Sequence, residues 1–76
     1  MKSENSKIRV LAVAMMLSTG ERMTTSKILR NLSAKYGITA DRKTIYDDIY
    51  AINRFIPIES SVGRGGGYQK VDVLGT

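Results

Sequence analysis

The sequence predicts a mainly α-helical α+β fold in which three helices precede a small two-stranded β-hairpin. Apolar residues recur at helical spacing in three separate segments. The third segment ends at Pro57, and short alternating segments then flank a glycine-rich loop, as they do in a hairpin. Because 76 residues suit one small domain, we expect a single domain over residues 1–76, with an ordered core at about residues 7–73.

The first predicted helix runs from Lys7 to Ser18 and ends before Gly20. Its apolar residues fall on two faces, one with Ile8, Leu11, Ala12 and Met15 and the other with Val10, Val13 and Leu17. A helix that is apolar on two sides is either buried centrally or carries a dimer surface. We expect the second face to pack under the hairpin, and a dimer seam is the competing interpretation.

The second predicted helix runs from about Thr25 to Lys35. Thr24 is a good N-cap for it, and Gly37 supplies the turn at its other end. Its predicted buried stripe consists of Ile28, Leu29 and Leu32.

The third predicted helix runs from about Arg42 to Phe55, with Asp41 as its N-cap. Its predicted buried stripe consists of Ile45, Ile49, Ile52 and Ile56. A helical wheel places on the opposite face Lys43, Tyr46, Asp47, Tyr50 and Arg54. After Pro57, alternation predicts two short strands, one around Ile58 and one with Tyr68, Val71 and Val73.

The composition excludes several classes of function. The chain has no cysteine and no histidine, which removes disulfides, reactive thiols, the usual zinc ligands and the usual general base. We therefore expect no enzyme activity, no metal and no cofactor, and no small-molecule site is evident. The longest apolar run is too short to span a membrane. The absence of cysteine and histidine fits a cytoplasmic location. Twelve cations against seven anions give a net charge of +5, which suits a polyanionic partner.

A short turn joins the second and third predicted helices. The connecting residues "KYGITAD" include Gly37, and such a turn sets two helices at a steep angle in a helix-turn-helix. Together with the hairpin that follows, these helices predict a winged helix-turn-helix, in which the hairpin is the wing.

The segment "ILRNLSAKYGITADRKTIYDDIYAINRFIPIESSVGRGGGYQK" resembles the winged-helix DNA-binding domain of the DeoR-like class. It is most similar to the form found at the N-terminus of bacterial regulators that carry a WYL sensor domain. The resemblance covers about residues 7–71 and is most specific in "DRKTIYDDI" followed by "GRGGGY". It implies a bacterial protein whose third helix enters the major groove of DNA, while the glycine-rich wing touches the backbone or the minor groove.

The sequence departs from this family in two respects. Asp47 stands where the family usually has a cation, which puts a direct DNA contact by this position in doubt. The family's regulators also continue into an effector-binding domain, so the resemblance implies no ligand-sensing function for these 76 residues.

The residues predicted to contact DNA are Ser26, Lys27, Arg42, Lys43, Thr44, Tyr46, Asp47, Tyr50 and Arg64. Those in the first turn of the third helix lie where side chains reach base edges and phosphates, unless that turn is simply solvated. The two tyrosines lie four residues apart and can bond phosphates, pack on sugars, or only stabilise the helix. Ser26 and Lys27 lie at the N-terminus of the second helix, which suits a phosphate. Arg64, at the tip of the wing, can enter a minor groove.

The adjacent aspartates have different predicted roles because successive helical side chains diverge by about 100°. Asp48 lies at the edge of the buried stripe, where we expect an ion pair with a neighbouring helix and take Arg30 as the candidate partner. Asp47 lies on the exposed face and has three interpretations. It pairs with Lys43, accepts a hydrogen bond from cytosine, or marks a face that no longer meets DNA.

These observations favour sequence-specific binding of double-stranded DNA, by a transcriptional regulator or its DNA-binding domain. We therefore expect the protein to associate with the nucleoid through DNA. One such module buries only about 600–1,000 Å², so a homodimer or tandem binding sites are expected. The competing hypothesis is a winged-helix module that binds protein and not DNA. It is supported by the charge of residues 41–55, where three cations balance three anions: Arg42, Lys43 and Arg54 against Asp41, Asp47 and Asp48.

Overall fold

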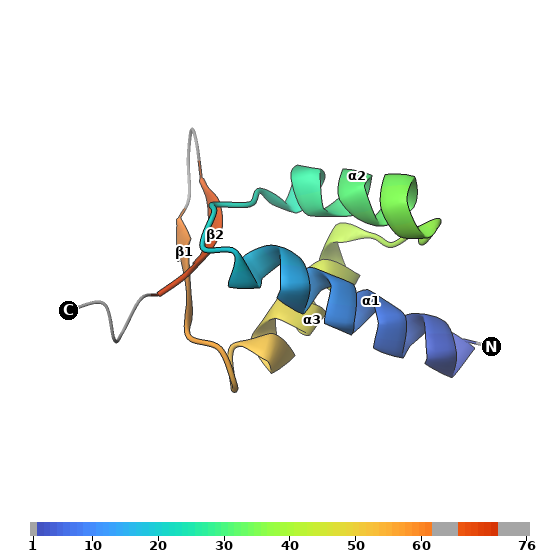
Figure 1. The fold of residues 1–76 in the computed structure, drawn as a ribbon, viewed down its shortest axis with the longest axis horizontal. Coiled ribbons are helices and arrows are strands. Elements are labelled where there is room, and N and C mark those ends of the chain that lie inside the picture. The colour runs from blue at the N-terminus through green and yellow to red at the C-terminus, as the bar shows by residue number, and fades with distance from the viewer. Residues whose placement is uncertain (1, 62–65, 72–76) are drawn as a thin grey trace.

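A computed structural model of the chain describes residues 2–61 and 66–71. It contains helices α1, α2 and α3 and strands β1 and β2, with the bounds Lys2–Ser18, Thr25–Tyr36, Arg42–Ile52, Ile58–Ser61 and Gly67–Lys70. The predicted order of three helices and an antiparallel hairpin is confirmed, and the arrangement is compatible with a winged helix. In Figure 1 the hairpin lies at one end of the three helices, beside the C-terminal end of α1.

The ends of α2 follow the local signals in the sequence. The side-chain oxygen of Thr24 accepts a hydrogen bond from the Lys27 amide at 3.1 Å, which satisfies one of the free amides of the first turn. Gly37 adopts the left-handed conformation, with φ 66°, and closes the C-terminal end. Both predicted caps are therefore confirmed, and α2 extends one residue further than predicted, to Tyr36.

Two helix ends differ from the prediction. Helix α1 begins at Lys2, well before the predicted Lys7. Helix α3 ends at Ile52 and not at Phe55, because the backbone changes to tighter turns before Pro57. The Arg54 amide donates to the Ala51 carbonyl at 3.2 Å and the Phe55 amide to the Ile52 carbonyl at 2.9 Å, which are three-residue steps and not α-helical ones.

The hydrophobic core lies where the three helices meet, and each helix contacts the other two. Its buried members are Ala12, Val13, Leu17, Met23, Ile28, Leu32, Ile45, Ile49 and Ile52. The predicted stripes of α2 and α3 are confirmed at the five core positions that belong to these helices. Leu29 and Ile56, also predicted in the stripes, are only partly buried at the edge of the core.

Only one of the two apolar faces of α1 is buried. Val13 and Leu17 are fully buried, and α1 also contacts β2, as expected for a face that packs under the hairpin. On the other predicted face Ala12 is buried, but the remaining residues are largely exposed: the exposed fractions are 47% for Ile8, 65% for Leu11 and 65% for Met15. Helices α2 and α3 both pack on the Val13 side, so among the described residues Ile8, Leu11 and Met15 are left largely exposed.

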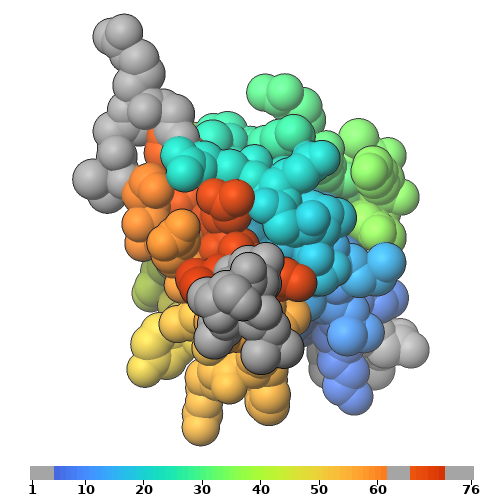
Figure 2. Space-filling model, turned by 60° about the vertical axis from the view of Figure 1, so that its left-hand side comes forward, coloured from blue at the N-terminus to red at the C-terminus, as the bar shows by residue number. Residues whose placement is uncertain are grey.

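The hairpin is held against the link between α1 and α2. Strands β1 and β2 are antiparallel, with Ile58 opposite Lys70 and Ser61 opposite Gly67. Met23, in the link, exchanges two backbone hydrogen bonds with Tyr68 of β2, each 2.8 Å long. Figure 2 shows the same contact as the orange and red strands against the cyan link.

A glycine is required at the start of β2. Gly67 has φ 149°, and a Cβ atom there would lie 2.6 Å from the Met23 carbonyl oxygen. The hairpin can therefore approach the link closely only because this position has no side chain. Beyond β2, the Val71 amide donates to the Pro57 carbonyl at 2.8 Å, whereas Val73 lies outside the described residues.

Candidate nucleic-acid interface

The candidate interface is built on the exposed side of α3. The Asp41 carboxylate caps this helix by accepting a hydrogen bond from the Thr44 amide at 2.8 Å. The hydrogen bonds that this carboxylate accepts from Thr44 lower the pKa of Asp41. The bond from the Thr44 side chain has the larger effect and the bond from its backbone amide the next. The cap therefore stays ionised and fixes the first turn, from which Arg42 and Lys43 project into solvent.

One contact joins the first turns of α2 and α3. The Arg42 guanidinium donates to the Ser26 hydroxyl oxygen at 2.8 Å, and both side chains are exposed. The structure thus brings together two of the residues predicted to contact DNA. The Ser26 hydroxyl accepts one hydrogen bond, whereas a guanidinium has five N–H donors. The contact therefore orients the Arg42 guanidinium and leaves its other donors to solvent.

The exposed face of α3 carries polar and aromatic groups. The exposed fraction is 46% for Tyr46 and 77% for Tyr50, and Lys43 and Asp47 are exposed beside them. Within the described part of the chain, Lys43 and Asp47 form no ion pair, so the Asp47 carboxylate remains open to solvent. Thr44, in the first turn, is only partly exposed.

Asp48 is withdrawn from this face and pairs with α1. The Arg9 guanidinium meets its two carboxylate oxygens, with Nε 2.5 Å from one and Nη2 2.9 Å from the other. The side chains are 19% and 6% exposed, respectively, so the aspartate is the more deeply buried partner. The hydrogen bond to Asp48 raises the pKa of Arg9, and the Coulomb attraction adds to it against the opposing effect of burial.

The expected ion pair between Asp48 and a neighbouring helix is present, but Arg30 as its partner was wrong. Arg30 is exposed on α2, whereas Arg9 approaches from α1. The signal in the sequence was the cation itself, since Arg9 interrupts the apolar run "KIRVLAVAMML" on the side of α1 that packs on α3. A cation within an apolar helix is rarely buried without a partner.

The wing is anchored by polar contacts as well as by Met23. The Gln69 side chain donates to the Gly20 carbonyl at 3.0 Å, and Arg22 donates to the Gln69 side-chain oxygen at 3.5 Å. Arg22 was not among the residues predicted to contact DNA, but it places a cation beside the hairpin. Arg64 lies outside the described residues, so its contact with DNA stays a prediction.

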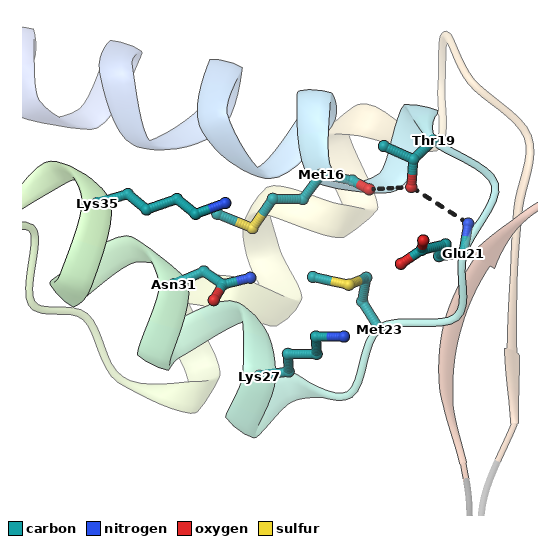
Figure 3. A pocket seen from close by; sticks show the side chains of 7 residues that line it. All are labelled: Met16, Thr19, Glu21, Met23, Lys27, Asn31 and Lys35. Atoms are coloured by element: carbon teal, nitrogen blue, oxygen red, sulfur yellow. Dashed lines mark hydrogen bonds between the residues drawn. The ribbon is translucent and has the colours of Figure 1, made fainter.

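Lys27 belongs to a different surface from Ser26. A hollow of about 330 Å³ lies between α1 and α2 (Figure 3), and its lining comprises Met16, Thr19, Glu21, Met23, Lys27, Asn31 and Lys35. The side chains of Lys27, Asn31 and Lys35 line it from successive turns of α2. The structure therefore does not bring Lys27 and Ser26 to one point, and the predicted DNA contact of Lys27 stays untested.

Two further observations concern the described residues. No group of three or more His, Cys, Asp or Glu side chains in residues 2–61 and 66–71 is placed to hold a metal ion. None of the helices found there is both long enough and apolar enough to cross a membrane.

Comparison of the chain with protein-family models, with curated proteins and with solved structures gave no significant match.

Proposed function

We propose that this chain binds double-stranded DNA sequence-specifically, as a transcriptional regulator or as the DNA-binding domain of one. Helix α3 enters the major groove, and the hairpin contacts the backbone or the minor groove. The observation that carries the proposal is the exposed face of α3. It presents Tyr46 and Tyr50 after a first turn that carries Lys43 and in which Ser26 of α2 orients Arg42.

The contacts divide by chemistry. Arg42 and Lys43 carry donors suited to guanine O6 and N7 or to phosphate, and they project from the end of the helix that approaches bases in helix-turn-helix proteins. Tyr46 and Tyr50 carry hydroxyl groups on exposed rings, which suit phosphate and sugar contacts along the groove. The exposed Ser26 hydroxyl lies in the first turn of α2, where free amides favour a phosphate.

The charges of the described residues support an anionic partner. Asp48 appears in the sequence to make α3 acidic, but the guanidinium of Arg9 neutralises it within the fold. The exposed acidic residues of this segment are then Asp41 and Asp47, and its exposed cations are Arg42, Lys43 and Arg54. The chain as a whole retains its excess of five positive charges.

The proposal includes membership of the DeoR-like family. The segment "DRKTIYDDI" forms the cap and most of α3, and the last two residues of "GRGGGY" begin β2. Their order and spacing support a relationship to the DeoR-like winged helices of WYL-domain regulators. In that arrangement Arg64 enters the minor groove.

A second candidate function is protein binding through the same fold without DNA. The observation that favours it is the zero net charge of residues 41–55, since most DNA-reading helices are basic. The two functions differ in salt dependence, because only phosphate contacts release the counterions condensed on DNA.

The test is a titration of the purified chain against a pool of random-sequence duplexes, followed by selection and sequencing of the bound fraction. We expect binding at low salt, an enriched motif, and a log–log salt slope of about −0.9 per phosphate contacted. Absence of binding at low salt would overturn the proposal. Binding with the expected slope but no enriched motif would overturn sequence specificity alone.

A further inference from the structure

The exposed apolar side of α1 continues onto the end of α3. Ile8, Leu11 and Met15 follow one another at spacings of three and four residues, so they form one ridge along α1. Phe55, in the turn after α3, is 87% exposed. Single exposed apolar residues are ordinary, but a contiguous group on a small protein marks an interaction surface.

An apolar groove runs beside this ridge, between α1 and the C-terminal end of α3. Its volume is about 210 Å³, and its lining comprises Val10, Leu11, Ala14, Ala51, Ile52, Phe55 and Ile56. Every described residue of this lining has an apolar side chain. Leu11 belongs both to the ridge and to the edge of the groove, so a protrusion and a depression of matching chemistry lie side by side.

We propose that a second copy of this chain occupies the groove. Two α1 helices pack against each other about a two-fold axis near Leu11, and Leu11 of each copy enters the groove of the other. A two-fold interface requires a surface that is complementary to itself. The ridge and the groove meet this requirement because each copy offers the protrusion that the other can accommodate.

The charges on this side of α1 select an antiparallel arrangement. Lys7 and Ser18 are both exposed near the direction of Leu11, about three turns apart along the helix. The last turn of α1 contains no basic residue, so no cation of that turn faces the negative end of the helix dipole. Antiparallel packing brings each Lys7 toward that end of the partner helix, whereas parallel packing sets the two lysines side by side.

This inference does not depend on DNA binding. It rests on apolar surface, groove shape and charge on α1, and the residues proposed to contact DNA contribute nothing to it. A monomer that binds DNA would overturn the proposed dimer and leave the proposed function intact. A dimer that does not bind DNA would overturn the proposed function and leave the dimer intact.

The first test measures the oligomeric state of the full chain by sedimentation equilibrium over rising protein concentration. We expect a monomer–dimer equilibrium, and we expect Leu11→Glu to raise its Kd by about 30-fold or more, as for a central interface residue. Ala34→Glu, which adds the same charge on the exposed side of α2, is the matched control and should leave the Kd unchanged. Circular dichroism verifies that both variants remain helical.

A wild-type chain that stays monomeric at all concentrations overturns the proposal, even if Leu11 turns out to bind a different protein. A dimer that Leu11→Glu leaves intact overturns the assignment of this face.

The second test uses disulfide cross-linking, which is selective because the chain has no native cysteine. Leu11→Cys lies at the axis and should form a disulfide-linked dimer under mild oxidation. Ser18→Cys should not, since antiparallel packing separates the two positions by about 20 Å along the helices, beyond the reach of a disulfide. Absence of the Leu11→Cys product, or cross-linking of Ser18→Cys, overturns this arrangement.

Discussion

Arg9 of α1 and Asp48 of α3 form a two-point ion pair between residues that are 39 positions apart in the sequence. The pair joins the first helix to the helix that carries the candidate interface. It also takes one carboxylate off the exposed face of α3, since the Asp48 side chain is only 6% exposed. The same contact thus fixes the orientation of α3 and changes the charge that α3 presents to a partner.

Removal of Arg9 should destabilise the fold more than removal of Asp48. Arg9→Met leaves a buried carboxylate without a partner, and we expect a loss of about 3–5 kcal/mol in the free energy of unfolding. Asp48→Leu should cost less, because the Arg9 side chain is 19% exposed and its guanidinium can reach water. Urea denaturation of each variant measures both losses.

The double variant Arg9→Met with Asp48→Leu is the control for this comparison. Since it leaves no buried charge, it should recover most of the stability lost in Arg9→Met. Losses that simply add would show that the two side chains do not act as a pair.

Local signals in the sequence predicted the helix caps at Thr24, Gly37 and Asp41, but contacts between residues distant in sequence did not follow from such signals. Thr24, Gly37 and Asp41 were predictable because each acts on amides or carbonyls within a few residues. The partner of Asp48 was not, because Arg30 and Arg9 are both cations on neighbouring helices and only tertiary packing distinguishes them. For the same reason the buried face of α1 was ambiguous: Leu11 and Leu17 are equally apolar, but α2 and α3 cover only one of them.

The cap of α3 should weaken in acid. Because the pKa of Asp41 is lowered in the folded state, its contribution to stability is fully present above the ordinary value of 3.8 and is lost as the pH falls through the lowered pKa. Asp41→Asn keeps an equally good capping oxygen but does not titrate. Thermal unfolding should therefore show a stability advantage of the wild type at neutral pH that disappears in strong acid. A difference between the two proteins that stays constant with pH would contradict the prediction.

Gly67→Ala should detach the wing from the link. An added Cβ would meet the Met23 carbonyl at 2.6 Å, and φ 149° is unfavourable for any residue with a side chain. We expect a loss of about 3 kcal/mol or more and faster hydrogen exchange at the Met23 and Tyr68 amides, whose hydrogen bonds hold the strands together.

Gly20→Ala is the matched control for the wing variant. Gly20 also has positive φ, 87°, but nothing lies within 4 Å of its added Cβ. It should therefore cost only the backbone strain, about 1–2 kcal/mol, with little change in exchange at Tyr68. Equal losses in both variants would show that the close approach at Gly67 is unimportant.

Asp47 is the residue that best tests the proposed DNA contact of α3, because its carboxylate is exposed between Lys43 and Tyr50 and forms no ion pair with Lys43. If Asp47 accepts a hydrogen bond from a base, Asp47→Asn should change the selected motif at one position. If it only repels phosphate, Asp47→Arg should tighten binding to all sequences alike and steepen the salt slope by about one contact. Ala34→Arg adds the same charge on α2 and controls for general attraction. Unchanged affinity and motif in both Asp47 variants would place position 47 away from the DNA, and with it the central part of the proposed interface.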